Sequence, residues 1–189
     1  MTSHDEFQMH QPPKPPITYR PATPADAEAI AALHAQSWRQ SYRGILTDAY
    51  LDGDTFADRR DVWQRRLSDP APNQFLLVAE TGGAVRGFVC AFGDDDPRWG
   101  TLVDNLHVTQ ALKGSGVGTA LLERVGEWVK AGRRHPGFHL WVFEANHAAR
   151  RFYENRGGET VEQEIKDNPG GGQALTYRIA WPTATLRVG

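Results

Sequence analysis

Cysteine is almost absent from this chain of 189 residues: its one cysteine, Cys90, lies in an apolar segment and cannot form an internal disulfide. A small buried side chain is the ordinary role of such a residue. No apolar run approaches the length of a membrane span, and the first residues lack the apolar core of a signal peptide. Basic charge is not in excess either, because the formal net charge is −2. These absences predict a cytoplasmic protein with neither a membrane nor a nucleic-acid partner.

Proline is concentrated at the start of the chain, and this separates a short N-terminal segment from the rest of the sequence. Residues 1–16 are polar and contain closely spaced prolines, as in an extended and flexible N-terminal tail. The remainder has the length of one domain with a sizeable core. We therefore expect a single domain over residues 17–182, followed by a short C-terminal tail at 183–189.

Helical and strand periodicities alternate along this domain. A capping signal at 23–26 precedes apolar residues at helical spacing, and a second helical region is interrupted at Gly53. The patterns predict helices at 23–42, 47–67, 119–130 and from 146 to the glycines at 157–158, and strands at 17–20, 74–80, 85–93, 102–108, 138–143, 160–165 and 174–181. Two hairpin signals supply antiparallel pairs, so a mixed α/β sheet is expected.

Metal-ligating residues do not form a convincing set. Asp94, Asp95 and Asp96 are expected to form a turn with Pro97, because three consecutive side chains cannot all point at one ion. His34 and His107 have no partner at ligand spacing. We expect no metal site.

The most informative stretch joins a buried strand, LVDNLHV at 102–108, to a glycine-rich turn and an amphipathic helix. Glycines at 114, 116 and 118 leave no side chain between the backbone and a ligand. A helix that opens at this turn directs free N–H groups and its positive dipole outward, which suits a pyrophosphate. An ordinary corner made by the glycines is the alternative. The spacing fits neither a P-loop nor the dinucleotide fingerprint.

The stretch instead resembles the acetyl-CoA loop of the GNAT superfamily of N-acetyltransferases, in which Arg/Gln-x-x-G-x-Gly/Ala follows a strand that ends in L-x-V. Lys113 stands where the family usually has Arg or Gln, and it keeps the cation without planar hydrogen bonding. A second GNAT signature is present in Asn146, Ala149, Phe152 and Tyr153. The resemblance spans about residues 17–181. It implies the GNAT fold: a mixed, mostly antiparallel sheet with helices on both faces and a V-shaped splay between the fourth and fifth strands.

The resemblance further implies an N-acetyltransferase that uses acetyl-CoA as co-substrate and transfers the acetyl group directly to a primary amine in a ternary complex. Its cofactor-binding residues would be Leu106, His107, Val108, Lys113, Gly114, Ser115, Gly116, Val117, Gly118, Thr119 and Asn146. Tyr153 matches the usual general acid, with a core tyrosine whose hydroxyl is satisfied as the alternative. A degenerate domain that binds CoA as a sensor or scaffold is the rival interpretation.

The general base is predicted on the strand at 102–108. Because side chains alternate, Asp104 shares a face with Leu106, and His107 lies on the opposite face unless a bulge at Leu106–His107 re-aims it. Other GNAT enzymes often place a base or a water-ordering residue at the position of Asp104. Asp104 is therefore our first candidate, His107 the second and Glu144 the third. In the alternative interpretation, Asp104 only caps or pairs with a neighbouring element.

The acceptor site is predicted near the end of the first helix, which walls this site in GNAT proteins. Trp38, Tyr42 and Arg43 are the candidate substrate-binding residues. Trp38 and Tyr42 are spaced i, i+4, so the alternative is that they pack together. The expected acceptor is the amine of a small molecule or a peptide, and a homodimer is left open.

Overall fold

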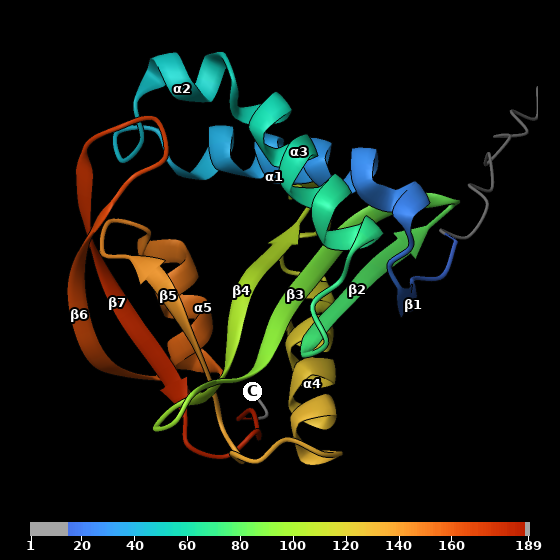
Figure 1. Ribbon diagram of the computed structural model, residues 1–189, viewed down its shortest axis with the longest axis vertical. Helices are drawn as coiled ribbons and strands as arrows, with labels where there is room; N and C mark the ends of the chain where they lie inside the picture. The colour runs from blue at the N-terminus through green and yellow to red at the C-terminus, as the bar shows by residue number, and fades with distance from the viewer. Residues whose placement is uncertain (1–14, 188–189) are drawn as a thin grey trace, which may run out of the picture.

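The structure is a computed structural model that describes residues 15–187 (Figure 1). The predicted N-terminal tail therefore lies outside the described residues, apart from Pro15 and Pro16. Along the chain the elements are β1 (Thr18–Pro21), the 3₁₀ turn η1 (Pro24–Asp26), α1 (Ala27–Ser41), α2 (Asp48–Asp52), α3 (Thr55–Ser68), β2 (Gln74–Thr81), β3 (Ala84–Asp96), β4 (Gly100–Val108), η2 (Gln110–Leu112), α4 (Val117–Lys130), β5 (Phe138–Phe143), α5 (His147–Asn155), β6 (Glu159–Asp167) and β7 (Gln173–Trp181). Among these helices, none is long and apolar enough to cross a membrane.

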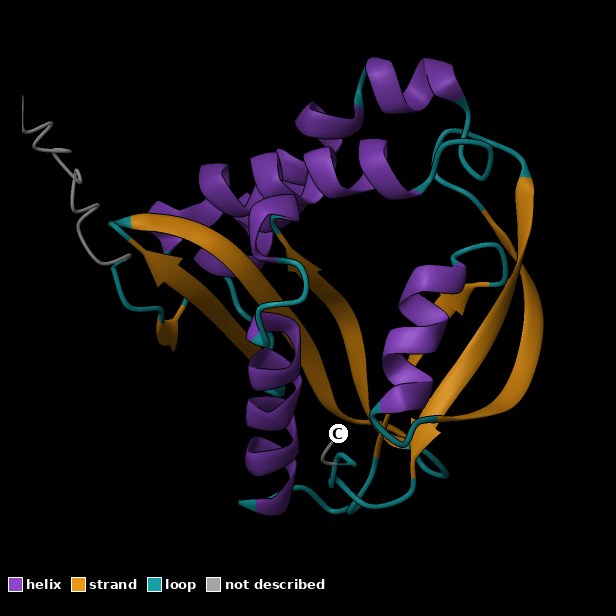
Figure 2. Cartoon of the chain, turned by 180° about the vertical axis from the view of Figure 1, so that it is seen from behind, coloured by secondary structure: helices purple, strands orange, loops and turns teal. Residues whose placement is uncertain are grey.

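One seven-stranded sheet organises the fold, in the order β1-β2-β3-β4-β5-β7-β6. All neighbours are antiparallel except β4 and β5, which run parallel and pair only at Thr101↔Phe138 and Leu102↔His139. Beyond these two pairs the strands diverge, as the views from the front and from behind both show (Figures 1 and 2). The predicted mixed, mostly antiparallel sheet with a splay between the fourth and fifth strands is confirmed.

Helices cover both faces of the sheet, as predicted. Val117, Leu121 and Val125 of α4 pack with residues of β2 to β5 and β7 in one buried cluster, against which α5 also packs. Ile30 of α1 and Trp63 of α3 belong to a second cluster on the other face of β2 and β3. These three apolar residues of α4 recur every four positions, and this helical spacing is why the sequence predicts the helix.

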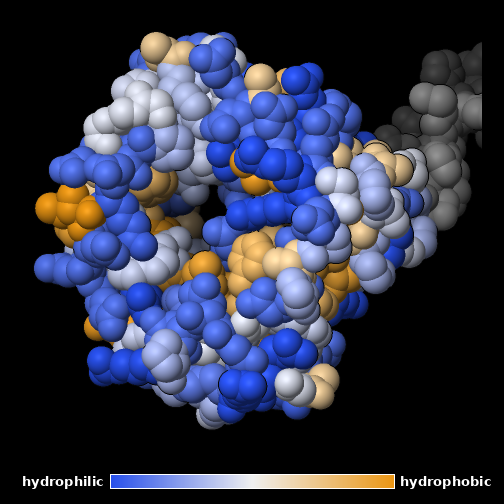
Figure 3. Space-filling model, in the orientation of Figure 1, coloured by the Kyte–Doolittle hydropathy of each residue, from blue (hydrophilic) through white to orange (hydrophobic). Residues whose placement is uncertain are grey.

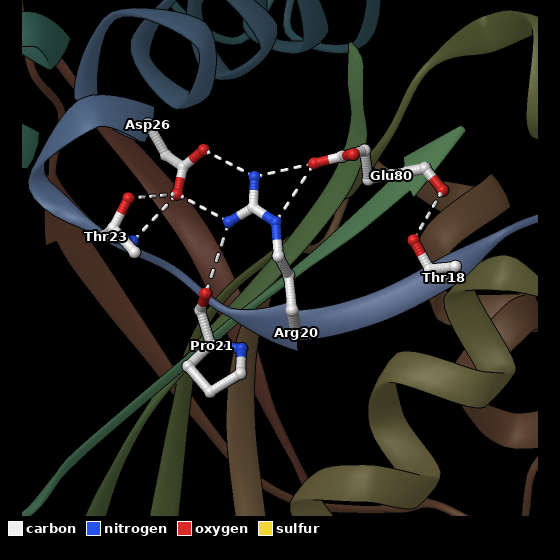
Figure 4. Close-up of polar contacts among 6 residues, drawn as sticks. All are labelled: Thr18, Arg20, Pro21, Thr23, Asp26 and Glu80. Carbon is white, nitrogen blue, oxygen red and sulfur yellow. Dashed lines mark hydrogen bonds and ion pairs between the residues drawn. The ribbon is translucent and has the colours of Figure 1, made fainter. Parts of the chain in front are cut away.

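The entry into α1 is held by a charged cluster (Figure 4). The carboxylate of Asp26 accepts hydrogen bonds from the backbone N–H and the hydroxyl of Thr23. These bonds form the helix N-terminal cap that the sequence predicts at 23–26. The Arg20 guanidinium of β1 lies 2.8 Å from Asp26 and 2.6 Å from Glu80 of β2. Its hydrogen bonds hold the pKa of Asp26 at about 2, below the ordinary 3.8. This cluster ties the edge strand to the first helix.

The predicted turn at 94–97 is wrong by three residues. β3 continues to Asp96, and the turn follows it. Asp96 is held in place because its carboxylate accepts the backbone N–H groups of Arg98 and Trp99 and pairs with Arg178 of β7. These bonds to the next turn and to a distant strand cannot be read from local composition.

Residues of the predicted C-terminal tail contact the core. Ala184 is buried, its N–H donates to the carbonyl of Pro136, and its own carbonyl lies against Gly126 of α4. A Cβ on Gly126 would stand 2.7 Å from that carbonyl, so the contact depends on glycine.

Candidate active site

The divergence of β4 and β5 opens a cavity of about 560 Å³, and a hollow is visible at this face of the molecule (Figure 3). Its lining runs from Ser37 to Thr176 and draws on α1, β4, α4, β5, α5, β6 and β7. The lining includes Ser37, Ser41, Tyr42, Asp104, Asn105, Leu106, His107, Val108, Lys113, Gly114, Gly116, Gly118, Thr119, Trp141, Phe143, Asn146, Phe152, Tyr153, Arg156, Lys166, Asp167 and Thr176.

The glycine turn is open toward this cavity. Gly114 and Gly116 have positive φ angles of 79° and 87°, and a Cβ on either would meet no atom within 4 Å. Gly116 is the N-cap of α4, whose first turn leaves backbone N–H groups without intrahelical partners. Two predicted loop residues point elsewhere: the Ser115 hydroxyl donates to the Leu112 carbonyl, and the Val117 side chain is buried in the core.

Arg156 is a site residue that the sequence reasoning missed. It follows α5, lines the cavity, and its Nε donates to the hydroxyl of Thr119 at 3.0 Å. Together with Lys113 it places two cations at the glycine turn. The only sequence signal was its place just after the second GNAT signature, and nothing there indicated which way the side chain would point.

The pairing of β4 with β3 contains a bulge at Asp104. Cys90 pairs with Asn105, but the next residue, Ala91, pairs with Val103, so Asp104 is the extra residue. The extra residue resets the alternation of side chains. Asp104 and His107 therefore both reach the α1/α3 side of the sheet. The prediction that they lie on opposite faces is wrong, and so is the predicted place of the bulge.

Asp104 is paired with the neighbouring helix α3. Nη1 of Arg66 lies 2.7 Å from Oδ2 of Asp104, and the Asn105 amide donates to the same oxygen. The ion-pair alternative is thus what the structure contains, and Asp104 is also one of the residues that line the cavity.

His107 is held between β4 and α1. Its Nδ1 lies 2.8 Å from the Ser37 hydroxyl oxygen, and its ring is 4.5 Å from the ring of His34. Burial lowers the pKa of His107 to about 3, with further lowering by the cations of Lys113 and Arg59. The imidazole is therefore neutral at ordinary pH. Ser37, which the sequence reasoning also missed, lines the cavity beside it.

Tyr153 enters the cavity from α5. Burial raises the pKa of its phenol, and the nearby Tyr42 raises it further, so the group stays protonated at neutral pH. Its ring packs against Phe152 and Trp181. Within residues 15–187, the structure contains no hydrogen bond from this hydroxyl to a protein group. Asn146, which lines the same cavity, caps α5 by accepting the N–H of Ala149 at 3.2 Å.

The three residues predicted to bind the acceptor separate in space. Tyr42 lines the cavity, with its ring 4.9 Å from Phe143, and burial raises its pKa to about 12. Trp38 is not part of the lining; it packs against Tyr42 and lies under the guanidinium of Arg59, as in the packing alternative. Arg43 points away and pairs with Asp48 and Asp52.

Glu144, the third candidate for the base, is also outside the cavity lining, and its carboxylate lies 3.8 Å from Arg150. The structure thus brings Tyr42, Asp104, His107, Tyr153 and the glycine turn into one cavity. It leaves Trp38, Arg43, Ser115, Val117 and Glu144 out of the lining.

Comparison of the sequence with known protein families and proteins identifies relatives of this chain. The family model described as "Acetyltransferase (GNAT) family" matches residues 33–157, so the chain belongs to the GNAT acetyltransferase family. The probable N-acetyltransferase Rv2775 of Mycobacterium tuberculosis is 32% identical over 149 residues, which cover 74% of this chain and 78% of that protein. The uncharacterized N-acetyltransferase YuaI of Bacillus subtilis is 24% identical over 151 residues, or 78% and 83% of the two chains.

Solved structures share the fold. The PaiA N-acetyltransferase of Thermoplasma acidophilum, in complex with coenzyme A, aligns with a TM-score of 0.65 at 18% identity over 86% of this chain and 98% of that one. A GNAT acetyltransferase of Streptococcus pneumoniae aligns with a TM-score of 0.61 at 25% identity over 88% and 99%.

Proposed function

We propose that this protein transfers an acetyl group from acetyl-CoA directly to the primary amine of a small molecule or peptide, within a ternary complex. One observation carries the proposal: a single cavity joins the open glycine turn, the diverging edge of β4 and the phenol of Tyr153. Membership of the GNAT family supports acetyl transfer as the reaction class.

The residues present suit acetyl-CoA. The open turn at Gly114 and Gly116, the free N–H groups of α4 and the cations of Lys113 and Arg156 would hold the pyrophosphate. Beyond Leu102, β4 no longer pairs with β5, so the backbone of 106–108 offers a strand edge to the amides of the pantetheine arm. Bound acetyl-CoA would supply the activated acetyl thioester.

Two proton transfers remain for the side chains of the cavity. Tyr153 would donate its proton to the departing thiolate, and burial keeps the phenol in the protonated form that this step requires. The Asp104 carboxylate would accept the proton of the attacking amine, directly or through water. The neutral imidazole of His107 is the second candidate for this role, since the bulge places it on the same side.

A thiol-release assay with acetyl-CoA and a panel of amines, amino acids and peptides tests the proposal. We expect release of CoA thiol that depends on the acceptor, together with acetylated product by mass spectrometry. Binding of acetyl-CoA without acceptor-dependent release across the panel would contradict an enzyme and favour a CoA-binding sensor or scaffold.

A further inference from the structure

One wall of the cavity carries a primary amine of the protein itself. Lys166, near the end of β6, and Trp141 of β5 are both among the residues that line the cavity. Nζ of Lys166 lies 3.6 Å from the centre of the Trp141 ring, and Oε2 of Glu164 lies 3.4 Å from the same nitrogen. A group of the chemical kind that the proposed reaction acetylates therefore stands at the wall of the candidate site.

The register of the diverging strands places Trp141 across the opening from the first candidate for the base. β4 and β5 run parallel, and their last pair is Leu102↔His139. Asp104 follows this pair by two residues along β4, and Trp141 follows it by two residues along β5. In Figure 1, β5, β7 and β6 form one side of the opening and β4 forms the other. The ammonium group on the Trp141 ring thus lies across the opening from the strand that would carry the pantetheine arm.

The Trp141 ring contacts two cations, and they are held differently. The Arg178 guanidinium lies 4.7 Å from the ring centre, pairs with Asp96 at 2.6 Å and has a side chain that is only 14% exposed. The Lys166 side chain is 35% exposed, and its ion-pair partner Glu164 is 58% exposed. Exposed ion pairs of this kind hold a side chain weakly, and the lysine stem is flexible. Of the two cations, Lys166 is therefore the one that can turn toward a bound thioester.

We propose that Lys166 is an intramolecular acceptor: when acetyl-CoA occupies the cavity and no other amine does, the protein acetylates its own Lys166 at Nζ. This inference rests on the proposed function and adds a modification site to it. Acetylation would remove the positive charge from this wall of the cavity, together with the contact between that charge and the Trp141 ring.

The transfer uses the groups already assigned to the cavity. The Lys166 ammonium gives a proton to the neighbouring Glu164 carboxylate or, through water, to that of Asp104. The lone pair of Nζ then attacks the carbonyl carbon of the thioester, the C–S bond breaks, and the departing thiolate takes the proton of Tyr153, which solvent replaces. The new amide nitrogen loses its second proton as the C–S bond breaks. Overall, the lysine ammonium and acetyl-CoA give N-acetyllysine, CoA thiol and one proton.

Mass spectrometry of the protein after incubation with acetyl-CoA alone tests the inference. The other lysines of the sequence are Lys14, Lys113 and Lys130, so each site can be followed separately. We expect Lys166 to be acetylated about tenfold or more faster than Lys130, which is exposed at the end of α4 and outside the cavity lining. The rate at Lys166 should saturate with acetyl-CoA and should not depend on protein concentration, because the reaction occurs within one molecule.

Two variants and one competitor sharpen this measurement. Lys166→Arg keeps a cation that can stack on Trp141 and should abolish the fast modification, while the slow one at Lys130 continues. Lys130→Arg is the matched control and should leave the rate at Lys166 unchanged. Excess CoA, which carries no acetyl group, should slow acetylation of Lys166 and leave that of Lys130 unchanged. Circular dichroism confirms folding of both variants.

Acetylation of Lys166 no faster than that of Lys130 would overturn the inference, and so would a rate at Lys166 that excess CoA does not lower. A rate that rises in proportion to protein concentration would also overturn it, since the acceptor would then belong to another molecule. Each of these results leaves the proposed function standing if an added amine still causes release of CoA thiol. Failure of acetyl-CoA to bind by calorimetry would instead remove the proposed function, and this inference with it.

Discussion

The guanidinium of Arg66 on α3 lies 2.7 Å from the carboxylate of Asp104, the extra residue of the β4 bulge. This contact joins a helix of one layer to the strand that would carry the pantetheine arm. Asp104 also lines the cavity, where an attacking amine would lose a proton. Asp104 thus combines a structural partner with a place in the candidate site.

Asp104→Asn should lower kcat/KM by roughly 10²-fold and flatten the acidic limb of its pH profile, in line with the usual contribution of a general base. Steady-state kinetics across pH, with an acceptor found in the thiol-release assay, measures this. Asp69→Asn, at an exposed position at the end of α3, is the control. A wild-type pH profile in Asp104→Asn would leave the ion pair with Arg66 as the residue's only role and favour His107 as the base.

Tyr153→Phe removes one hydroxyl and keeps the ring packing against Phe152 and Trp181. We expect kcat to fall by about 10²-fold with little change in acetyl-CoA affinity, because the lost group acts on the leaving thiolate. Tyr177→Phe makes the same chemical change on β7, outside the cavity lining, and should leave kcat unchanged. Equal turnover of Tyr153→Phe and wild type, with the chemical step rate-limiting, would make Tyr153 structural.

Gly116→Ala places a methyl group on the open turn, at a φ of 87°. It should weaken acetyl-CoA binding by about tenfold or more, because the backbone can no longer approach the pyrophosphate closely, and strain should cost about 1–2 kcal/mol of stability. Calorimetry measures the first effect and urea unfolding the second. Gly83→Ala is the control: it introduces similar backbone strain at a φ of 73° in the β2–β3 hairpin, outside the cavity lining. If both variants bind acetyl-CoA alike, the turn does not hold the pyrophosphate.

The Asp26 cluster predicts an acid-sensitive contribution to stability. The pKa of Asp26 is depressed to about 2 from 3.8 by Arg20, so its contribution is present above pH 3.8 and is lost as the pH falls toward 2. Asp26→Asn should lower the unfolding free energy at pH 7 by about 2 kcal/mol, and the difference should shrink between pH 4 and pH 2. Urea unfolding across this range measures it. A difference that does not change with pH would show that the loss comes from packing and not from the charge.

The elements that carry the site were predictable from sequence because their signals are local. The glycines at 114 and 116 precede the helix that they open, and α4 begins at Val117, two residues before the predicted 119, so that Gly118 lies in its first turn. The FHLWVF strand was predicted with its observed bounds, since a short apolar run between turn signals marks a buried strand. Tyr153 was predicted from the resemblance to the second GNAT signature, whose residues follow Asn146 along one helix.

Tertiary structure alone determined which side chains meet across the cavity. Alternation along β4 predicts the direction of Asp104 only while the pairing is regular, and one extra residue against β3 reverses it. The partnerships of Asp104 with Arg66, His107 with Ser37, Thr119 with Arg156 and Ile45 with Asn168 join segments 37 to 123 residues apart. Sequence determined the elements because hydrogen bonding within a helix and turn chemistry depend on near neighbours. The site required the fold, because strand register and layer packing bring distant residues into contact.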